Sequence, residues 1–173
     1  MNNRSFLLAL ALVVALCMPS VALATNDDGG SQSASILPVA EYVDVSAYLT
    51  EPADIDAWYT MIYNLKQNFD YICGDTFCEG EYTNIESLRY RCSVEGLTGT
   101  IGSCVWVFAA SNEEVSPSTG KIIVDVGTWR CRSPIVRGTS IHDLLSALAG
   151  PSPLYATLPE TDRSIYDGLV TCL

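Results

Sequence analysis

Cys104-Val-Trp-Val-Phe-Ala109 is an uninterrupted run of apolar residues in the middle of the chain. A short apolar run bounded by turn residues is typical of a strand that is buried on both faces. Gly102 precedes the run, and the polar residues 111–120, with Pro117 and Gly120, follow it. The sequence therefore predicts a central strand at 104–109 and a polar loop at 111–120.

Two further strands are predicted on either side of this run. In residues 88–94 apolar and polar side chains alternate, which is typical of a half-buried strand, and residues 121–132 (KIIVDVGTWRCR) form the third strand. The short connections favour an antiparallel meander. The residues predicted on the apolar face of the first strand are Leu88, Tyr90, Cys92 and Val94.

The clearest helix is predicted between Asp54 and Cys73. Asp54 is the expected N-cap with Pro52 just outside the helix, and Gly74 marks the end. Apolar residues recur at spacings of three and four, which gives one apolar stripe. The stripe consists of Ile55, Trp58, Tyr59, Ile62, Leu65, Phe69 and Ile72.

Short helices are predicted near the C-terminus. Ser140 and Asp143 have the spacing of a capping box, and Ser164 opens a last helix. Residues 39–45 are expected to form a short strand or an extended segment. The predicted fold class is α+β: a long N-terminal helix packed on a small antiparallel β-meander, with short C-terminal helices and disulfide bonds.

The N-terminus has the three parts of a secretion signal. Arg4 is followed by the apolar residues 6–18 and by a small-residue site that ends at Ala24. The apolar part is shorter than the about 20 residues that span a bilayer. We predict a signal peptide at 1–24, a disordered Gly/Ser-rich leader at 25–35, a single domain at 36–173 with no transmembrane segment, and a secreted or periplasmic location.

Cysteine usage supports export. One of the seven cysteines, Cys17, lies in the signal, which leaves an even number in the domain. An even count in an exported chain indicates disulfide bonds rather than a metal site, whose short C-x2-C spacing is missing. Cys92–Cys104 or Cys104–Cys131 is expected as a cross-strand bridge, and Cys172 is expected to pair with Cys73 or Cys78.

The chain is strongly acidic, with 9 Lys and Arg against 20 Asp and Glu and a net charge of −11. Loss of Arg4 with the signal lowers this net charge to −12, because residues 1–24 contain no acid. Nucleic-acid binding normally requires a basic surface, so nucleic acid is excluded as a partner. Such a charge attracts a cationic protein.

A loop after the long helix is rich in carboxylates. Asp75 lies between Cys73 and Cys78, and Glu79 and Glu81 follow Cys78. Oxygen ligands on a turning backbone suit Ca²⁺, although the spacing is not that of an EF-hand. Paired carboxylates also serve glycoside hydrolysis. A solvated turn between helix and sheet is the third interpretation.

Four arginines are the second candidate group. Arg89 and Arg91 alternate on one strand, as do Arg130 and Arg132 on another, and side chains two apart in a strand share a face. If the two faces coincide, the guanidinium groups form an anion-binding patch. The alternative is a lattice of salt bridges with Glu86, Glu95 and Asp125.

No motif specifies a reaction. The only histidine, His142, stands beside Asp143, but neighbouring helical side chains do not face each other, and G-x-S-x-G is missing. The sequence favours an exported binding or inhibitor protein, without enzymatic activity, that engages a cationic partner through the acidic loop 75–86. The alternatives are a small secreted hydrolase and a calcium-stabilised structural module.

Overall fold

A computed structural model describes residues 40–173. The predicted signal peptide and leader lie outside the described residues, as do residues 36–39. The strands are β1 (Tyr42–Asp44), β2 (Glu86–Glu95), β3 (Ile101–Val115) and β4 (Ile122–Arg132), and the helices are α1 (Val45–Tyr48), α2 (Pro52–Thr76), α3 (Ile141–Ala147) and α4 (Ile165–Val170).

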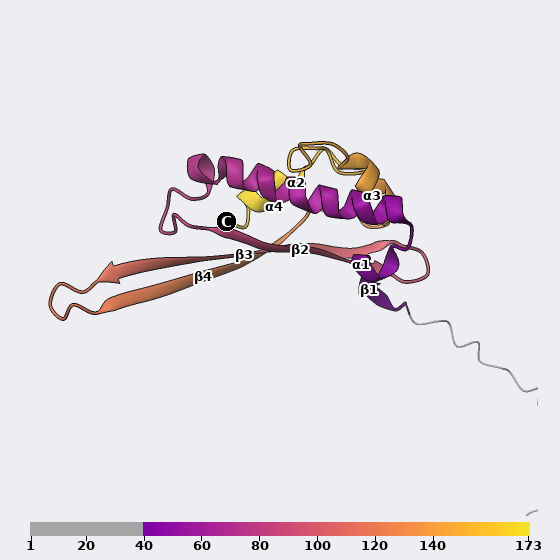
Figure 1. Cartoon of the computed structure of the whole chain (residues 1–173). Coiled ribbons are helices and arrows are strands. Elements are labelled where there is room, and N and C mark those ends of the chain that lie inside the picture. Colours follow the sequence, from indigo (N-terminus) through magenta and orange to yellow (C-terminus); the bar gives the residue numbers. More distant parts are fainter. Residues whose placement is uncertain (1–39) are drawn as a thin grey trace, which may run out of the picture. The chain divides into compact units, whose positions relative to one another are not determined.

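The strands form one antiparallel sheet in the order β1-β2-β3-β4. The predicted antiparallel sheet with accompanying helices is confirmed, and residues 42–44 are its short fourth strand. Helices α2, α3 and α4 lie on one side of the sheet, with α2 running along it (Figure 1). The opposite face of the sheet carries no helix within residues 40–173.

The long helix differs from the prediction at its start. It begins at Pro52 after the N-cap Glu51, whereas Asp54 lies in the first turn. Proline suits the first helical position, because its fixed φ is helical and its missing N–H would have had no partner there. The prediction of Asp54 as N-cap is therefore wrong. The description of the helix as N-terminal is not supported either, since β1 and α1 precede it.

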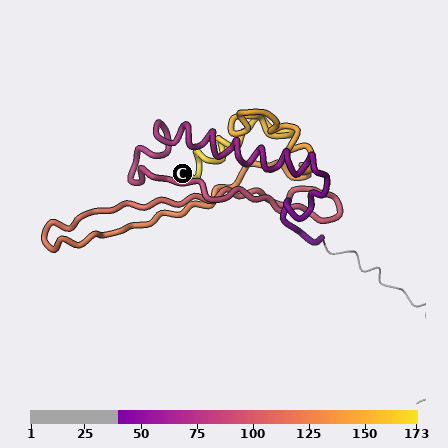
Figure 2. The backbone as a smooth tube through the Cα atoms, viewed as in Figure 1, coloured from indigo at the N-terminus to yellow at the C-terminus, as the bar shows by residue number. Residues whose placement is uncertain are grey.

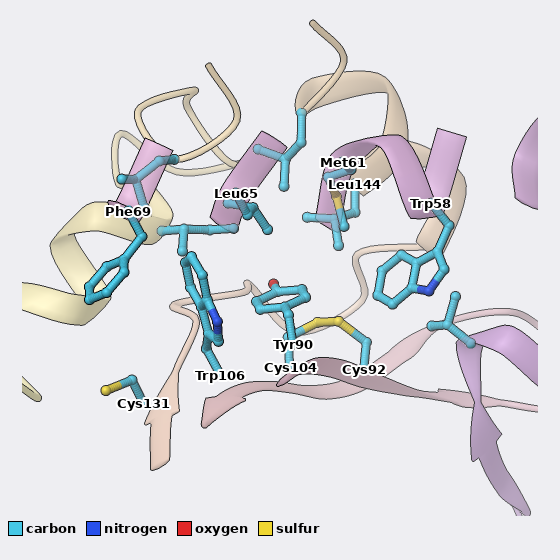
Figure 3. Close-up of a cluster of buried hydrophobic side chains, with 14 of the residues drawn as sticks. Trp58, Met61, Leu65, Phe69, Tyr90, Cys92, Cys104, Trp106, Cys131 and Leu144 are labelled. Atoms are coloured by element: carbon cyan, nitrogen blue, oxygen red, sulfur yellow. A yellow bond between two sulfur atoms is a disulfide. The ribbon is translucent and has the colours of Figure 1, made fainter. Parts of the chain in front are cut away.

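The core lies between α2 and the covered face of the sheet. Figure 3 shows Trp58, Met61, Leu65 and Phe69 of the helix directed toward the aromatic and cysteine side chains of the strands. Burying each such side chain stabilises the fold by about 1.5–3 kcal/mol. The ring centroids of Phe69 and Phe108 lie 4.7 Å apart, and those of Trp106 and Phe108 lie 4.9 Å apart.

Strand β2 contains a bulge that the sequence pattern did not predict. The register shifts between Ser87 and Arg89, so that Ser87 pairs with Phe108 and Arg89 with Val107. Leu88 is the extra residue, and it is 59% exposed instead of lying on the apolar face. After the bulge Tyr90, Cys92 and Val94 are buried as predicted.

The first half of the segment predicted as a polar loop, residues 111–115, is strand. Strand β3 continues to Val115, and β4 begins at Ile122, so the connecting turn is confined to residues 116–121. Residues 111–115 pair with 122–126 and form a two-stranded arm that extends beyond the helices (Figures 1 and 2). The loop prediction is wrong for residues 111–115, which form a strand by pairing with 122–126 although most of them are polar and no helix covers them.

Three disulfide bonds are present: Cys73–Cys78, Cys92–Cys104 and Cys131–Cys172. Cys92 and Cys104 are directly opposite in the β2–β3 register, which confirms one of the two predicted cross-strand pairings. The prediction that Cys172 pairs with Cys73 or Cys78 is wrong. Three disulfide bonds are compatible with an oxidising environment outside the cytosol.

Helix α3 begins at the predicted capping box, and α4 begins at the predicted Ser164, which also forms a capping box. The Ser140 and Asp143 side chains exchange hydrogen bonds with each other's backbone N–H groups at the start of α3, and Ser164 and Asp167 do the same for α4. In α4 a Cβ added at Gly168 would lie 2.9 Å from the Arg132 carbonyl oxygen. This close approach brings the chain end beside β4. No helix within residues 40–173 has the length and apolarity needed to cross a membrane.

Candidate functional site

The acidic loop lies at the end of α2 from which the arm extends. Asp75 stands in the last turn of α2, and Glu79 and Glu81 follow in the turns before β2. All three side chains are exposed. The loop therefore presents its carboxylates to solvent.

Calcium binding by this loop stays a prediction. Within the described part of the chain, no three His, Cys, Asp or Glu side chains are grouped so that they could hold a metal ion. If the loop binds Ca²⁺, EDTA should lower the Tm of the oxidised protein by several degrees, as followed by circular dichroism, and added Ca²⁺ should restore it. An unchanged Tm would contradict calcium binding.

Side-chain contacts join the acidic loop to the base of the arm. The Tyr82 hydroxyl donates a hydrogen bond to the Asp125 carboxylate at 2.6 Å, and the Tyr82 and Trp129 rings form a T-shaped pair with centroids 5.3 Å apart. Asn84 donates to the Ser111 hydroxyl at 3.2 Å and accepts from the Ser111 N–H at 3.1 Å. Loop and arm thus form one continuous surface.

The Tyr82–Asp125 contact makes this junction sensitive to alkaline pH. The hydrogen bond to Asp125 raises the pKa of Tyr82 from 10.0 to about 12. Because the folded-state pKa is raised, the stabilisation by this bond is complete below pH 10.0 and is lost as the pH rises through about 12. In an absorbance titration of tyrosinate, the difference between wild type and Tyr82→Phe should show one group that ionises near pH 12. A difference centred near pH 10 would contradict the hydrogen bond.

The arm combines apolar side chains with carboxylates. Its valines and isoleucines are between 57% and 69% exposed. The cross-strand pairs Val115–Ile122 and Glu113–Val124 lie on one face of the arm, and the pair Glu114–Ile123 lies on the opposite face. The apolar side chains are Val115, Ile122, Ile123, Val124 and Val126, the acidic ones are Glu113, Glu114 and Asp125, and Lys121 is the one basic residue.

The sheet register brings the four predicted arginines to the face that carries no helix. One row across the sheet reads Arg89–Val107–Arg130, and the next reads Arg91–Val105–Arg132. Paired residues of an antiparallel sheet point to the same side, so all four guanidinium groups share this face. All four side chains are exposed.

One of these arginines has an acidic partner. Arg91 Nε donates to Asp44 Oδ2 at 2.6 Å. Burial alone would raise the pKa of Asp44, but hydrogen bonds from Ser46 and Arg91 outweigh it and hold the pKa below its usual value of 3.8. Within residues 40–173, Arg89, Arg130 and Arg132 form no ion pair.

The acids expected in a salt-bridge lattice have other partners. Glu86 lies 3.6 Å from Lys66 Nζ on α2, and Glu95 accepts a hydrogen bond from the Thr98 N–H at 3.0 Å. Asp125 accepts a hydrogen bond from the Tyr82 hydroxyl. Within residues 40–173 none of these three acids pairs with an arginine, so the predicted lattice with them is wrong, and Arg89, Arg130 and Arg132 keep an unpaired positive charge.

His142 lies at the start of α3, with Nδ1 3.6 Å from an Asp54 carboxylate oxygen. Both residues line a hollow of about 270 Å³ together with Glu51, but no serine or cysteine lines it. The arrangement lacks the nucleophile of a Ser-His-Asp triad.

Two surfaces of opposite charge are therefore the candidates for function: the acidic loop with the arm, and the arginine face of the sheet. Comparisons with protein-family models, with curated proteins and with solved structures find no match to this chain.

Proposed function

We propose that this chain is an exported binding protein, without enzymatic activity, that engages a cationic protein through the arm and the adjoining acidic loop. The single observation that carries the proposal is the arm itself, in which exposed valine and isoleucine side chains are interleaved with carboxylates. An exposed apolar patch of this kind marks an interaction surface.

The chemistry of the partner follows from charge. Glu113, Glu114 and Asp125 of the arm continue the carboxylates of the loop, with Lys121 as the one opposing charge on the arm. Acidic groups around an apolar centre accelerate encounter with a basic surface and disfavour an acidic one. A second copy of this chain is disfavoured because each copy carries a net charge of −11.

The edge position of β4 gives the partner a second means of attachment. Strand β4 is the last strand of the sheet, so the outer edge of residues 122–126 is free to pair with an extended segment. Such strand addition supplies main-chain hydrogen bonds, while the alternating side chains supply selectivity. A basic hydrolase or toxin that exposes an extended segment has the required chemistry.

The test uses oxidised residues 25–173 as bait in envelope and culture-medium extracts at low salt. A basic protein released by a salt step is then purified and titrated against two variants. The arm variant is Ile123→Ser/Val124→Ser, and the matched control is Leu97→Ser, whose side chain is 77% exposed in the β2–β3 turn, away from the arm (Figure 1). Both variants change exposed positions, so both should fold.

The proposal predicts that the arm variant weakens binding about tenfold or more, because the apolar contact is lost, while Leu97→Ser binds like wild type. Raising the salt concentration should weaken wild-type binding steeply. Equal binding by the arm variant and the control, or affinity that does not depend on salt, would contradict the proposal. Concentration-dependent dimerisation through the arm would assign it to a second copy instead.

A further inference from the structure

A pocket lies at one end of the arginine face, the face of the sheet that carries no helix. The proposed function does not involve this pocket. Its volume is about 470 Å³, and it lies where β3 continues past the end of β4 and the chain returns through residues 133–138. Its polar and aromatic lining consists of Arg132, Arg137, Ser103, Ser133, Thr100 and Tyr42. We propose that this hollow binds a small anion that carries a carboxylate or phosphate group.

Charge is the first reason. Both charged residues of the lining are arginines, and no acidic side chain lines the hollow. Guanidinium groups bind carboxylate and phosphate oxygens through paired N–H donors, and the hydroxyl of Ser103 supplies a further donor. Arg132 makes no ion pair within residues 40–173 and is free to bind a ligand.

The shape of the hollow is the second reason. Gly102 lies beneath the ring of Tyr42, because a Cβ at this position would lie 2.6 Å from a Tyr42 ring carbon. The absence of a side chain therefore lets Tyr42 lie close against β3 and form one wall. A volume of about 470 Å³ lies within the range of about 300–1,000 Å³ for small-molecule sites.

The balance of local and overall charge selects a small ligand. At physiological ionic strength the Debye length is about 8 Å, so an ion inside the hollow responds mainly to the arginines around it. A long polyanion or an anionic bilayer would also face the rest of a chain with a net charge of −11. The hollow is thus suited to an anion about the size of a monosaccharide.

The test is calorimetric titration of the oxidised protein with inorganic phosphate and, separately, with galacturonate. Arg132→Gln and Arg137→Gln remove one donor group each, and Lys121→Gln at the arm removes the same charge outside the hollow. Ser103→Phe fills the hollow without changing the charge. Thermal melts of each variant report whether it folds.

Each arginine variant should weaken binding of at least one probe about tenfold or more, as loss of a charged hydrogen bond requires. Ser103→Phe should abolish binding, and Lys121→Gln should bind like wild type. Equal weakening by Lys121→Gln would show that overall charge, and not the pocket, governs binding, and would contradict the proposal. Failure of both probes to bind at millimolar concentration would also overturn it. Binding to phosphatidylglycerol vesicles alone would assign the arginines to a membrane surface and overturn it as well.

Discussion

Trp106→Ala should destabilise the protein by about 3–5 kcal/mol, the range observed when a buried tryptophan is truncated. Trp106 is 1% exposed, and its ring centroid lies 5.8 Å from those of both Phe69 and Tyr90. Truncation leaves a cavity between α2 and the sheet. It also removes the indole N–H that donates to the Ser87 hydroxyl at 2.8 Å.

Trp129→Ala is the matched control, because Trp129 is half-buried at the base of the arm and packs on Tyr82. Because Trp129 is only partly buried at the edge of the core, its cost should be smaller, about 1 kcal/mol, a common value for single substitutions. Urea unfolding followed by far-ultraviolet circular dichroism measures both changes. Similar losses for the two variants would contradict the placement of the core between α2 and the sheet.

Removal of the Cys131–Cys172 bond should have the second large effect. This bond joins residues 41 apart in sequence, whereas Cys92–Cys104 and Cys73–Cys78 join residues 12 and 5 apart. A longer closed loop restricts the unfolded chain more, which gives contributions of about 4, 3 and 2 kcal/mol in this order. The bond also fixes α4 beside the end of β4.

Paired alanine variants of the three bonds, unfolded under oxidising conditions, measure this ranking. The Cys131→Ala/Cys172→Ala protein should have the lowest unfolding midpoint, and protease digestion should release its C-terminal residues first. A variant of Cys73 and Cys78 that costs as much as this one would contradict the chain-entropy ranking. Peptide mapping of the unreduced wild type tests the connectivity itself.

The sequence pattern predicts those elements that bury one apolar face. Phe69 and Leu65 recur at helical spacing because α2 packs on the sheet, and Tyr90, Cys92 and Val94 alternate because β2 has a covered face. The capping serines act locally, so both C-terminal helices could be predicted from residues only three apart.

The arm could not be predicted in this way. Residues 111–115 are mostly polar because no helix covers them, and their strand conformation comes from pairing with 122–126. The hydrophobic period, which is the main local signal for a strand, is missing there. The alternating valines Val124 and Val126 indicate a strand at 122–126. Its partner, residues 111–115, has no such alternation.

The arginine face could be predicted only in part. Alternation along each strand places Arg89 with Arg91 and Arg130 with Arg132, but whether the two pairs share a face depends on the register and on the bulge at Leu88. The acids that stand near them in sequence contact other residues. Likewise, the pairing of Cys172 depends on where α4 lies, which follows from tertiary packing rather than from spacing.

Hydrogen–deuterium exchange of the chain, alone and with the basic protein that the wild type captures, shows whether the arm is the binding surface. We expect the backbone amides of residues 113–126 to exchange at least about tenfold more slowly in the complex, because the edge of β4 gains main-chain partners and the arm is covered. Slowing in the acidic loop should accompany it. Protection confined to the arginine face or to the β2–β3 turn, with the arm unchanged, would contradict binding through the arm.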